Sequence, residues 1–127
     1  MSSANLSSFV VNQVRDCLIV TIGNDLSRFS IEDLKGVVSR SIHENGCASI
    51  ILDLTNLNFM DTIEWEDLKA VCDIASVLGA QSIFVGIKVG IISHLIMNDA
   101  QTAGLNMAMS LDQALKILRV IDADSGN

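Results

Sequence analysis

A carboxylate and a hydroxyl stand side by side at Asp61 and Thr62, where the segment "LNFM" meets a helical pattern. With Asp61 as the N-cap, Glu64 falls at the third helical position, which is the spacing of a capping box and contributes roughly 1 kcal/mol. Capping therefore explains the pair on local sequence alone. A second interpretation is a phosphorylation switch. Thr62 would lie in a first helical turn, where partial positive charge and free backbone N–H groups accommodate a phosphate.

The residues around Thr62 decide what an added phosphate would do. A phosphoryl group carries about −1.5 to −2 charge, and Asp61, Glu64, Glu66 and Asp67 already make this segment acidic. A partner docked on the segment would meet new bulk and new negative charge together. The pattern therefore suits a switch that releases its partner.

Exposed contacts for such a partner are expected on the same predicted helix. Glu66, Lys69 and Asp73 fall on its polar side, opposite the apolar stripe. Trp65 falls between the two sides, so it is either an aromatic anchor for a partner or the edge of the core. The sequence leaves both roles open for this residue.

Other chemistry is poorly supported. The enzyme alternative is an acid-base pair of Asp53 and Asp61 at the end of one strand region, but no histidine or lysine completes a catalytic set. His43 and His94 lack metal-ligand spacing, and no phosphate-binding, dinucleotide-binding or hydrolase motif occurs. The three cysteines, Cys17, Cys47 and Cys72, include no C-x-x-C pair and are expected to be free thiols. We therefore expect no enzyme activity, metal or cofactor.

Length and charge limit the class of protein. A chain of 127 residues, half of them apolar, fits one domain with a sizeable core, expected at about residues 9–118 with flexible ends. The formal charge of −7 disfavours nucleic acid and anionic membranes as partners. The first residues lack the pattern of a signal peptide, and no apolar run is long enough to span a membrane. A cytoplasmic protein is expected.

Hydrophobic periodicity predicts the elements that must position Asp61 and Thr62. Two β-branched runs, residues 8–14 and 17–22, flank a polar pair and predict an antiparallel hairpin. Ser30 is predicted to cap a helix that ends near Asn45, before Gly46. The remaining predictions are a buried strand at 47–54, a helix at 62–78, a strand at 81–87, a helix from about 89, a strand at 105–109 and a helix from 111 to about 118. The order ββαβαβαβα predicts an α/β fold with a mixed, mostly parallel sheet and packed helices.

Two segments resemble a known family. "IILDLTNLNFMDT", followed by "VLGAQSIFVGIKVGII", is similar to the STAS domain of sulfate transporters and anti-sigma factor antagonists, over about residues 9–118. The similarity is greatest to the stressosome antagonists of the RsbS and RsbR type. It implies a non-enzymatic switch in which a serine/threonine kinase, itself the binding partner, phosphorylates Thr62. Asp53 and Asp61 correspond to the family's acids at the acceptor site.

The resemblance also implies assembly with other STAS proteins into a stressosome, which holds the kinase until phosphorylation releases it. Val85 occupies the place of a second phosphothreonine found in RsbR proteins, so only one site is expected. STAS domains also occur in transport complexes. The alternative is therefore a constitutive transport-associated subunit, in which Thr62 is only part of a helix cap.

Overall fold

A computed structural model describes residues 9–24, 28–100, 102 and 106–118, without the side chains of residues 28–30. The elements are β1 (Phe9–Val14), β2 (Cys17–Ile22), α2 (Arg28–Asn45), β3 (Ser49–Asp53), α3 (Thr62–Val77), β4 (Gln81–Val85), α4 (Val89–Met97), β5 (Met107–Ala108) and α5 (Leu111–Ile117). The predicted order ββαβαβαβα is confirmed. The five strands lie in the order β1-β2-β3-β4-β5, with β1 antiparallel to β2 and the other pairs parallel.

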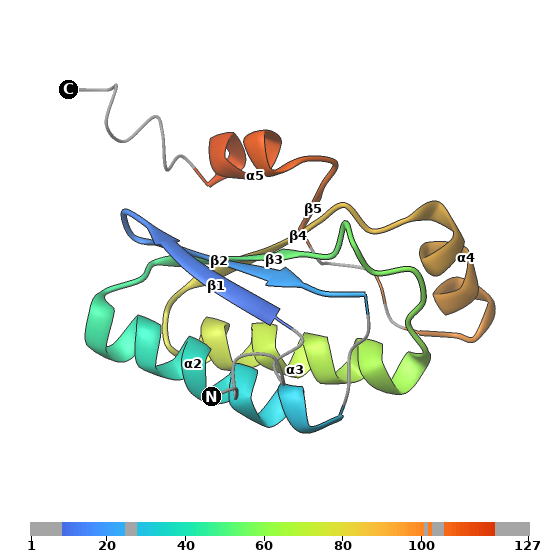
Figure 1. Ribbon diagram of the computed structural model, residues 1–127, viewed down its shortest axis with the longest axis horizontal. Coiled ribbons are helices and arrows are strands. Elements are labelled where there is room, and N and C mark those ends of the chain that lie inside the picture. Colours follow the sequence, from blue (N-terminus) through green and yellow to red (C-terminus); the bar gives the residue numbers. More distant parts are fainter. Residues whose placement is uncertain (1–8, 25–27, 101, 103–105, 119–127) are drawn as a thin grey trace.

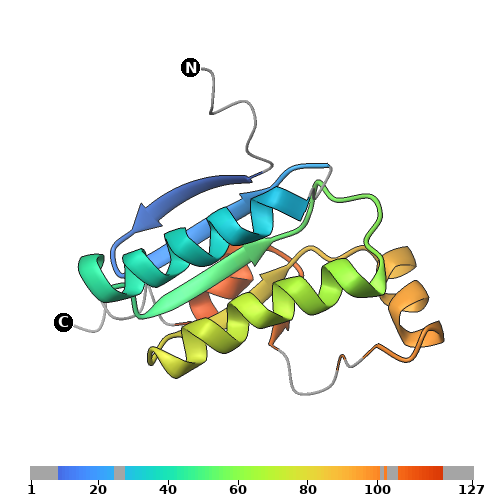
Figure 2. The same cartoon turned by 90° about the horizontal axis from the view of Figure 1, so that it is seen from below.

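Helices cover both faces of this sheet (Figure 1). Helices α2 and α3 lie on one face, side by side and roughly along the strands (Figure 2). Helix α5 packs on the other face, and α4 lies beyond the end of the sheet (Figure 1). Parallel strands joined by helical crossovers require this layered arrangement, because both faces of the sheet are apolar.

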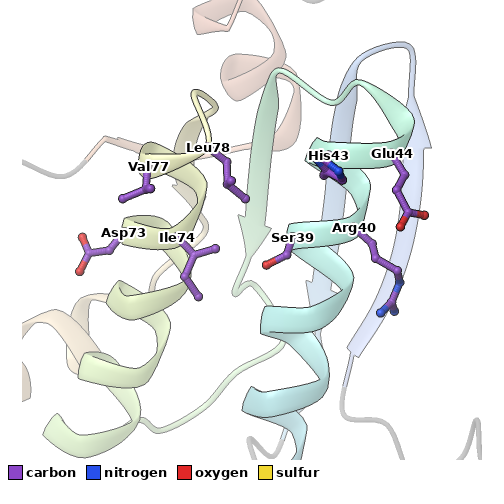
Figure 3. Close-up of a pocket in the computed structure, with 8 residues that line it drawn as sticks. All are labelled: Ser39, Arg40, His43, Glu44, Asp73, Ile74, Val77 and Leu78. Carbon is purple, nitrogen blue, oxygen red and sulfur yellow. The ribbon is translucent and has the colours of Figure 1, made fainter.

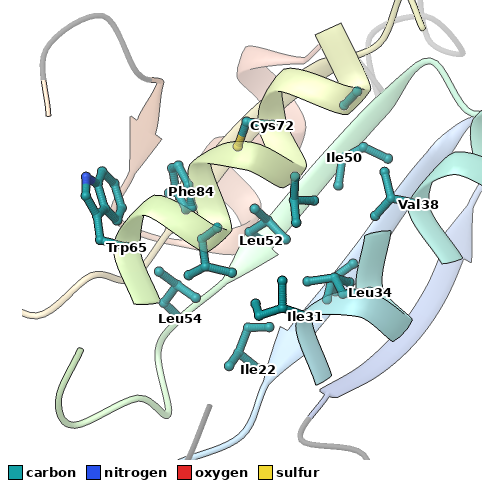
Figure 4. Packing of buried hydrophobic residues seen from close by; sticks show 14 of the residues in the cluster. Ile22, Ile31, Leu34, Val38, Ile50, Leu52, Leu54, Trp65, Cys72 and Phe84 are labelled. Atoms are coloured by element: carbon teal, nitrogen blue, oxygen red, sulfur yellow. The ribbon is translucent and has the colours of Figure 1, made fainter. Parts of the chain in front are cut away.

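Successive side chains of a β-strand point to opposite faces of the sheet. Because the central strands are apolar at consecutive positions, apolar side chains lie on both faces. Leu18, Val20, Ile50, Leu52 and Phe84 pack under α2 and α3 in the larger cluster, part of which is drawn in Figure 4. The strand residues next to these in sequence point the other way and form a second cluster with one residue of β5 and one of α5: Cys17, Ile19, Ile51, Ile83, Val85, Ala108 and Ala114. Successive strand residues therefore contribute to two separate cores.

Most predicted boundaries agree with the structure. Gly46 and Gly79 follow the ends of α2 and α3 and have positive φ, as expected at helix C-termini. The prediction that Ser30 is an N-cap is wrong, because α2 already includes Arg28 and Phe29, neither of which breaks a helix. The helix predicted at 62–78 ends one residue earlier, at Val77, and Leu78 lies beyond it with 42% of its surface exposed.

Three predictions concern segments outside the described residues. They are the start of the first strand at Ser8, the start of the last strand at Leu105 and the flexible ends of the chain. Within the part of the chain that is described, no helix has the length and apolar character needed to cross a membrane.

Candidate functional site

Helix α3 begins with the predicted capping box. The Asp61 carboxylate accepts a hydrogen bond from the Glu64 backbone N–H at 2.8 Å, and a Glu64 carboxylate oxygen accepts one from the Asp61 N–H at 3.0 Å. Thr62 is the first helical residue and is half-buried. The cap therefore holds the Thr62 backbone at a defined place beside the positive end of the helix.

Removing the cap acceptor should destabilise the protein. We expect Asp61→Ala to lower the free energy of unfolding by about 0.5–2 kcal/mol, because the Glu64 N–H loses its acceptor. Asp61→Asn keeps an acceptor oxygen and should lose less. Urea denaturation followed by circular dichroism measures both. Equal stability of Asp61→Ala and the wild type would mean that the cap bond makes no net contribution.

The loop of residues 54–61, which leads from β3 to Thr62, is held at two points. The Asp53 carboxylate accepts hydrogen bonds from Thr55, at 3.0 Å from its backbone N and 2.6 Å from its hydroxyl oxygen. The Lys88 ammonium donates to the backbone carbonyl oxygens of Thr55 and, at 2.8 Å, Leu57. Asp53 and Asp61 are thus each bonded within their own turn, where they shape the loop and the helix start.

Close packing of two loops requires glycine at position 86. Gly86, which follows β4, has a φ of +73°, a conformation that L-residues rarely adopt. A Cβ atom there would overlap the Thr55 hydroxyl and lie 3.1 Å from the Thr55 Cα atom. The loop after β4 therefore supports the loop that precedes Thr62.

Trp65, for which the sequence left open a partner contact or the edge of the core, lies in the core. Its side chain is 0% exposed and packs against Phe84, with 5.0 Å between ring centroids (Figure 4). Trp65 lies between the apolar and polar sides of α3. Its side chain is nevertheless covered, because β4 lies beneath this part of the helix. Trp65 thus anchors the start of α3 to the core.

The other predicted contacts lie on the surface of α3. Glu66 and Lys69 form an exposed ion pair at 3.4 Å, which contributes at most about 1 kcal/mol to stability. Asp73 is exposed and points away from α2 in Figure 3. Glu66 and Asp73 are exposed and Lys69 is partly exposed, and the use of these side chains by a partner remains a prediction.

Two exposed apolar side chains near Thr62 were not anticipated. Phe59 is 58% exposed, Ile63 is 72% exposed, and the Phe59 ring lies 5.3 Å from the His94 ring of α4, between centroids. Ile63 departs from the buried stripe of Leu68, Val71, Cys72 and Ala75, so helical phase alone would have placed it outside. The contact of Phe59 with α4 has no local sequence signal.

A groove lies between α2 and α3, at the ends of these helices farthest from Thr62 (Figure 2). Its volume is about 550 Å³, and Ile74, Leu78 and Ser39 point into it (Figure 3). His43 and Arg40 stand along its α2 side. This groove is therefore separate from the start of α3.

The three cysteines are buried free thiols, as expected. Burial raises the pKa of all three thiols, and that of Cys72 to about 11. Desolvation is the main cause for each, because a thiolate is poorly solvated inside the core. Among the described residues, no group of histidine, cysteine and carboxylate side chains could hold a metal ion.

The raised thiol pKa values predict a loss of stability in alkali. Between the unfolded thiol pKa, about 8.5, and the folded value of about 11 for Cys72, unfolding releases a proton, so stability falls as the pH rises. We expect Cys72→Ala to show a flatter decline across this range than the wild type. Urea midpoints at several alkaline pH values test this. Parallel curves for the two proteins would contradict it.

The fold and this site define the class of the protein. It is a small α/β domain with a mixed sheet, in which the helix that follows β3 is capped by Asp61 and begins with Thr62. The STAS domain model matches residues 8–114, and the chain belongs to the STAS domain family. No curated protein sequence matches it.

Solved structures share the fold. A serine-to-glutamate variant of Moorella thermoacetica RsbS is 20% identical, with a TM-score of 0.76 over 92% of this chain and 99% of that one. A chain from the stressosome, a signal integration and transduction hub, is 21% identical, with a TM-score of 0.76 over 89% and 98%. The Bacillus cell fate determinant SpoIIAA in its phosphorylated form is 16% identical, with a TM-score of 0.67 over 87% and 99%. The predicted STAS fold is therefore confirmed.

Proposed function

We propose that this chain is a non-enzymatic regulatory STAS protein of a bacterial stress-signalling pathway based on anti-sigma partner switching. It binds a serine/threonine switch kinase or an anti-sigma-type protein in the cytoplasm, and Thr62 is its phosphorylation site. Together with other STAS proteins it forms a stressosome-type scaffold. The observation that carries the proposal is the position of Thr62, half-buried at the first position of α3 and placed there by the Asp61 cap.

The proposed modification is a phosphoryl transfer from ATP. The Thr62 hydroxyl oxygen bonds to the γ-phosphorus, the bond to the β-phosphate oxygen breaks, ADP leaves, and the hydroxyl proton passes to a base of the kinase. The first-turn N–H groups of α3 favour the new negative charge by about 0.3–1 kcal/mol. The helix start therefore tolerates the phosphate.

Release of the partner follows from the surface around Thr62. Phe59 and Ile63 provide exposed apolar area, while Glu66 and Asp67 provide negative charge on the following turn. A partner that covers this area must accommodate a dianionic phosphate next to apolar contacts and existing carboxylates. Desolvation and like-charge repulsion both weaken that complex.

Phosphorylation at Thr62 can be tested directly. The purified protein is incubated with native-cell extract and ATP, and the modified residue is located by mass spectrometry. We expect phosphate on Thr62 in the wild type and in Ser76→Ala, which removes an exposed hydroxyl from the other end of α3, but not in Thr62→Ala. Phosphate that persists in Thr62→Ala would place the modification elsewhere.

Partner affinity tests the switch itself. Proteins captured from the extract by wild-type protein should bind Thr62→Glu at least about tenfold more weakly, and Thr62→Ala about as well as the wild type. Identical binding by all three would remove the switch. A stable complex with permease or ATPase subunits, indifferent to these substitutions, would instead favour a constitutive transport-associated subunit.

A further inference from the structure

A cavity of about 650 Å³ opens beyond the carboxyl ends of three parallel strands. Thr55 lies two residues after β3, Gly86 follows β4, and Met109 follows β5. In α/β proteins, loops at the carboxyl ends of strands commonly form ligand sites, because the chain diverges there into different helices. Neither the helix cap at Asp61 nor the groove between α2 and α3 contributes to this cavity.

The charge of the cavity points to an anion. Lys88 is the one charged side chain among the described residues that line it, in a protein whose formal charge is −7. An ammonium group has three N–H donors, and two acceptors are assigned here, the carbonyl oxygens of Thr55 and Leu57. One donor remains for a ligand. No side chain caps the first turn of α4, whose first residue, Val89, also lines the cavity.

The rest of the wall is mostly apolar. Ile92 of α4 and Met107 of β5 provide aliphatic and thioether surface, and the neutral polar groups are the side chains of Thr55 and Gln113. A small inorganic anion would leave this surface in contact with water. A ligand with one negative charge and an apolar body would satisfy Lys88 and cover the apolar wall at once.

We propose that this cavity binds a small amphiphilic monoanion, a carboxylate with an apolar chain, with its charged group at Lys88 and its chain against Ile92 and Met107. This site is additional to the proposed phosphorylation switch and does not depend on it. Because Lys88 also holds the loop before Thr62, the ligand would contact the residue that links the cavity to that loop.

The proposal can be tested by titrating ¹⁵N-labelled protein with decanoate, using decanamide and decyltrimethylammonium as neutral and cationic controls. We expect decanoate to shift the amide signals of Gly86, Val89 and Gln113, with little effect from either control. Val89→Glu places a carboxylate on the wall at a position that is 79% exposed and favours an acid at the helix start. It should weaken decanoate binding at least about tenfold through like-charge repulsion, whereas Val89→Gln should not.

Lys88→Met is the second variant, and it should also lose decanoate binding. Equal shifts with decanoate and decanamide would overturn the assignment of an anion. Decanoate shifts confined to the groove between α2 and α3, or no shifts at all, would overturn the site. Undiminished binding by Val89→Glu and Lys88→Met would show that the charged group lies elsewhere.

Discussion

Trp65→Ala is expected to lower the free energy of unfolding by about 3–5 kcal/mol. The side chain is fully buried, so truncation removes a large apolar contact area and leaves a cavity between α3 and the sheet. It also removes the ring contact with Phe84, which is worth about 0.5–1.5 kcal/mol beyond burial. Domains are commonly stable by only about 5–15 kcal/mol, so this single change removes a large fraction of the total.

Urea denaturation followed by circular dichroism measures this loss, and Ile63→Ala is the matched control. Ile63 is a large apolar residue on the same helix but is 72% exposed, so its truncation should change stability by no more than about 0.5 kcal/mol. Trp65 is the only tryptophan of the chain, so its fluorescence reports the same transition in the control. Similar losses in the two variants would contradict the core role of Trp65.

Gly86→Ala is expected to lower the free energy of unfolding by about 2–6 kcal/mol, the sum of an unfavourable backbone conformation and an overpacked contact. The new methyl group would meet the Thr55 hydroxyl and backbone, and the positive φ is strained for alanine in any case. Because Thr55 belongs to the loop that leads to Thr62, the displacement should also slow the proposed phosphorylation of Thr62. Thermal or urea unfolding gives the stability term independently of any kinase.

Gly90→Ala is the matched control for this change. Gly90 lies in α4, and a Cβ atom built there meets nothing within 4 Å. Alanine is favoured over glycine in helices, so stability should be unchanged or rise by up to about 1 kcal/mol. In Thr55→Ala the hydroxyl is gone, and adding Gly86→Ala to that background should cost less than it does in the wild type. Equal costs in both backgrounds would mean that the overlap with the Thr55 hydroxyl does not cause the loss.

The order of elements and the helix cap could be predicted from the sequence because their signals are local. A capping box joins residues three apart, and the core stripe of α3 repeats at three and four residues, so both are set by helix geometry. Continuous apolar runs predicted strands buried on both faces, and the two clusters confirm this. The place of Thr62 at the first helical position, directly after the Asp61 cap, was therefore visible without a structure.

Tertiary structure decided the features that depend on residues far apart in the chain. Trp65 lies at the edge of the helical stripe, and only the position of Phe84 in β4 determined that it is buried. Lys88 bonds to carbonyl groups 33 and 31 residues earlier, and Gly86 is needed only because Thr55 approaches it. The hydrophobic periodicity of a segment indicates which side of a helix or strand faces the core. Contacts between loops at the ends of neighbouring strands arise only when the sheet brings those ends together, and the cavity beside Lys88 belongs to this second kind of feature.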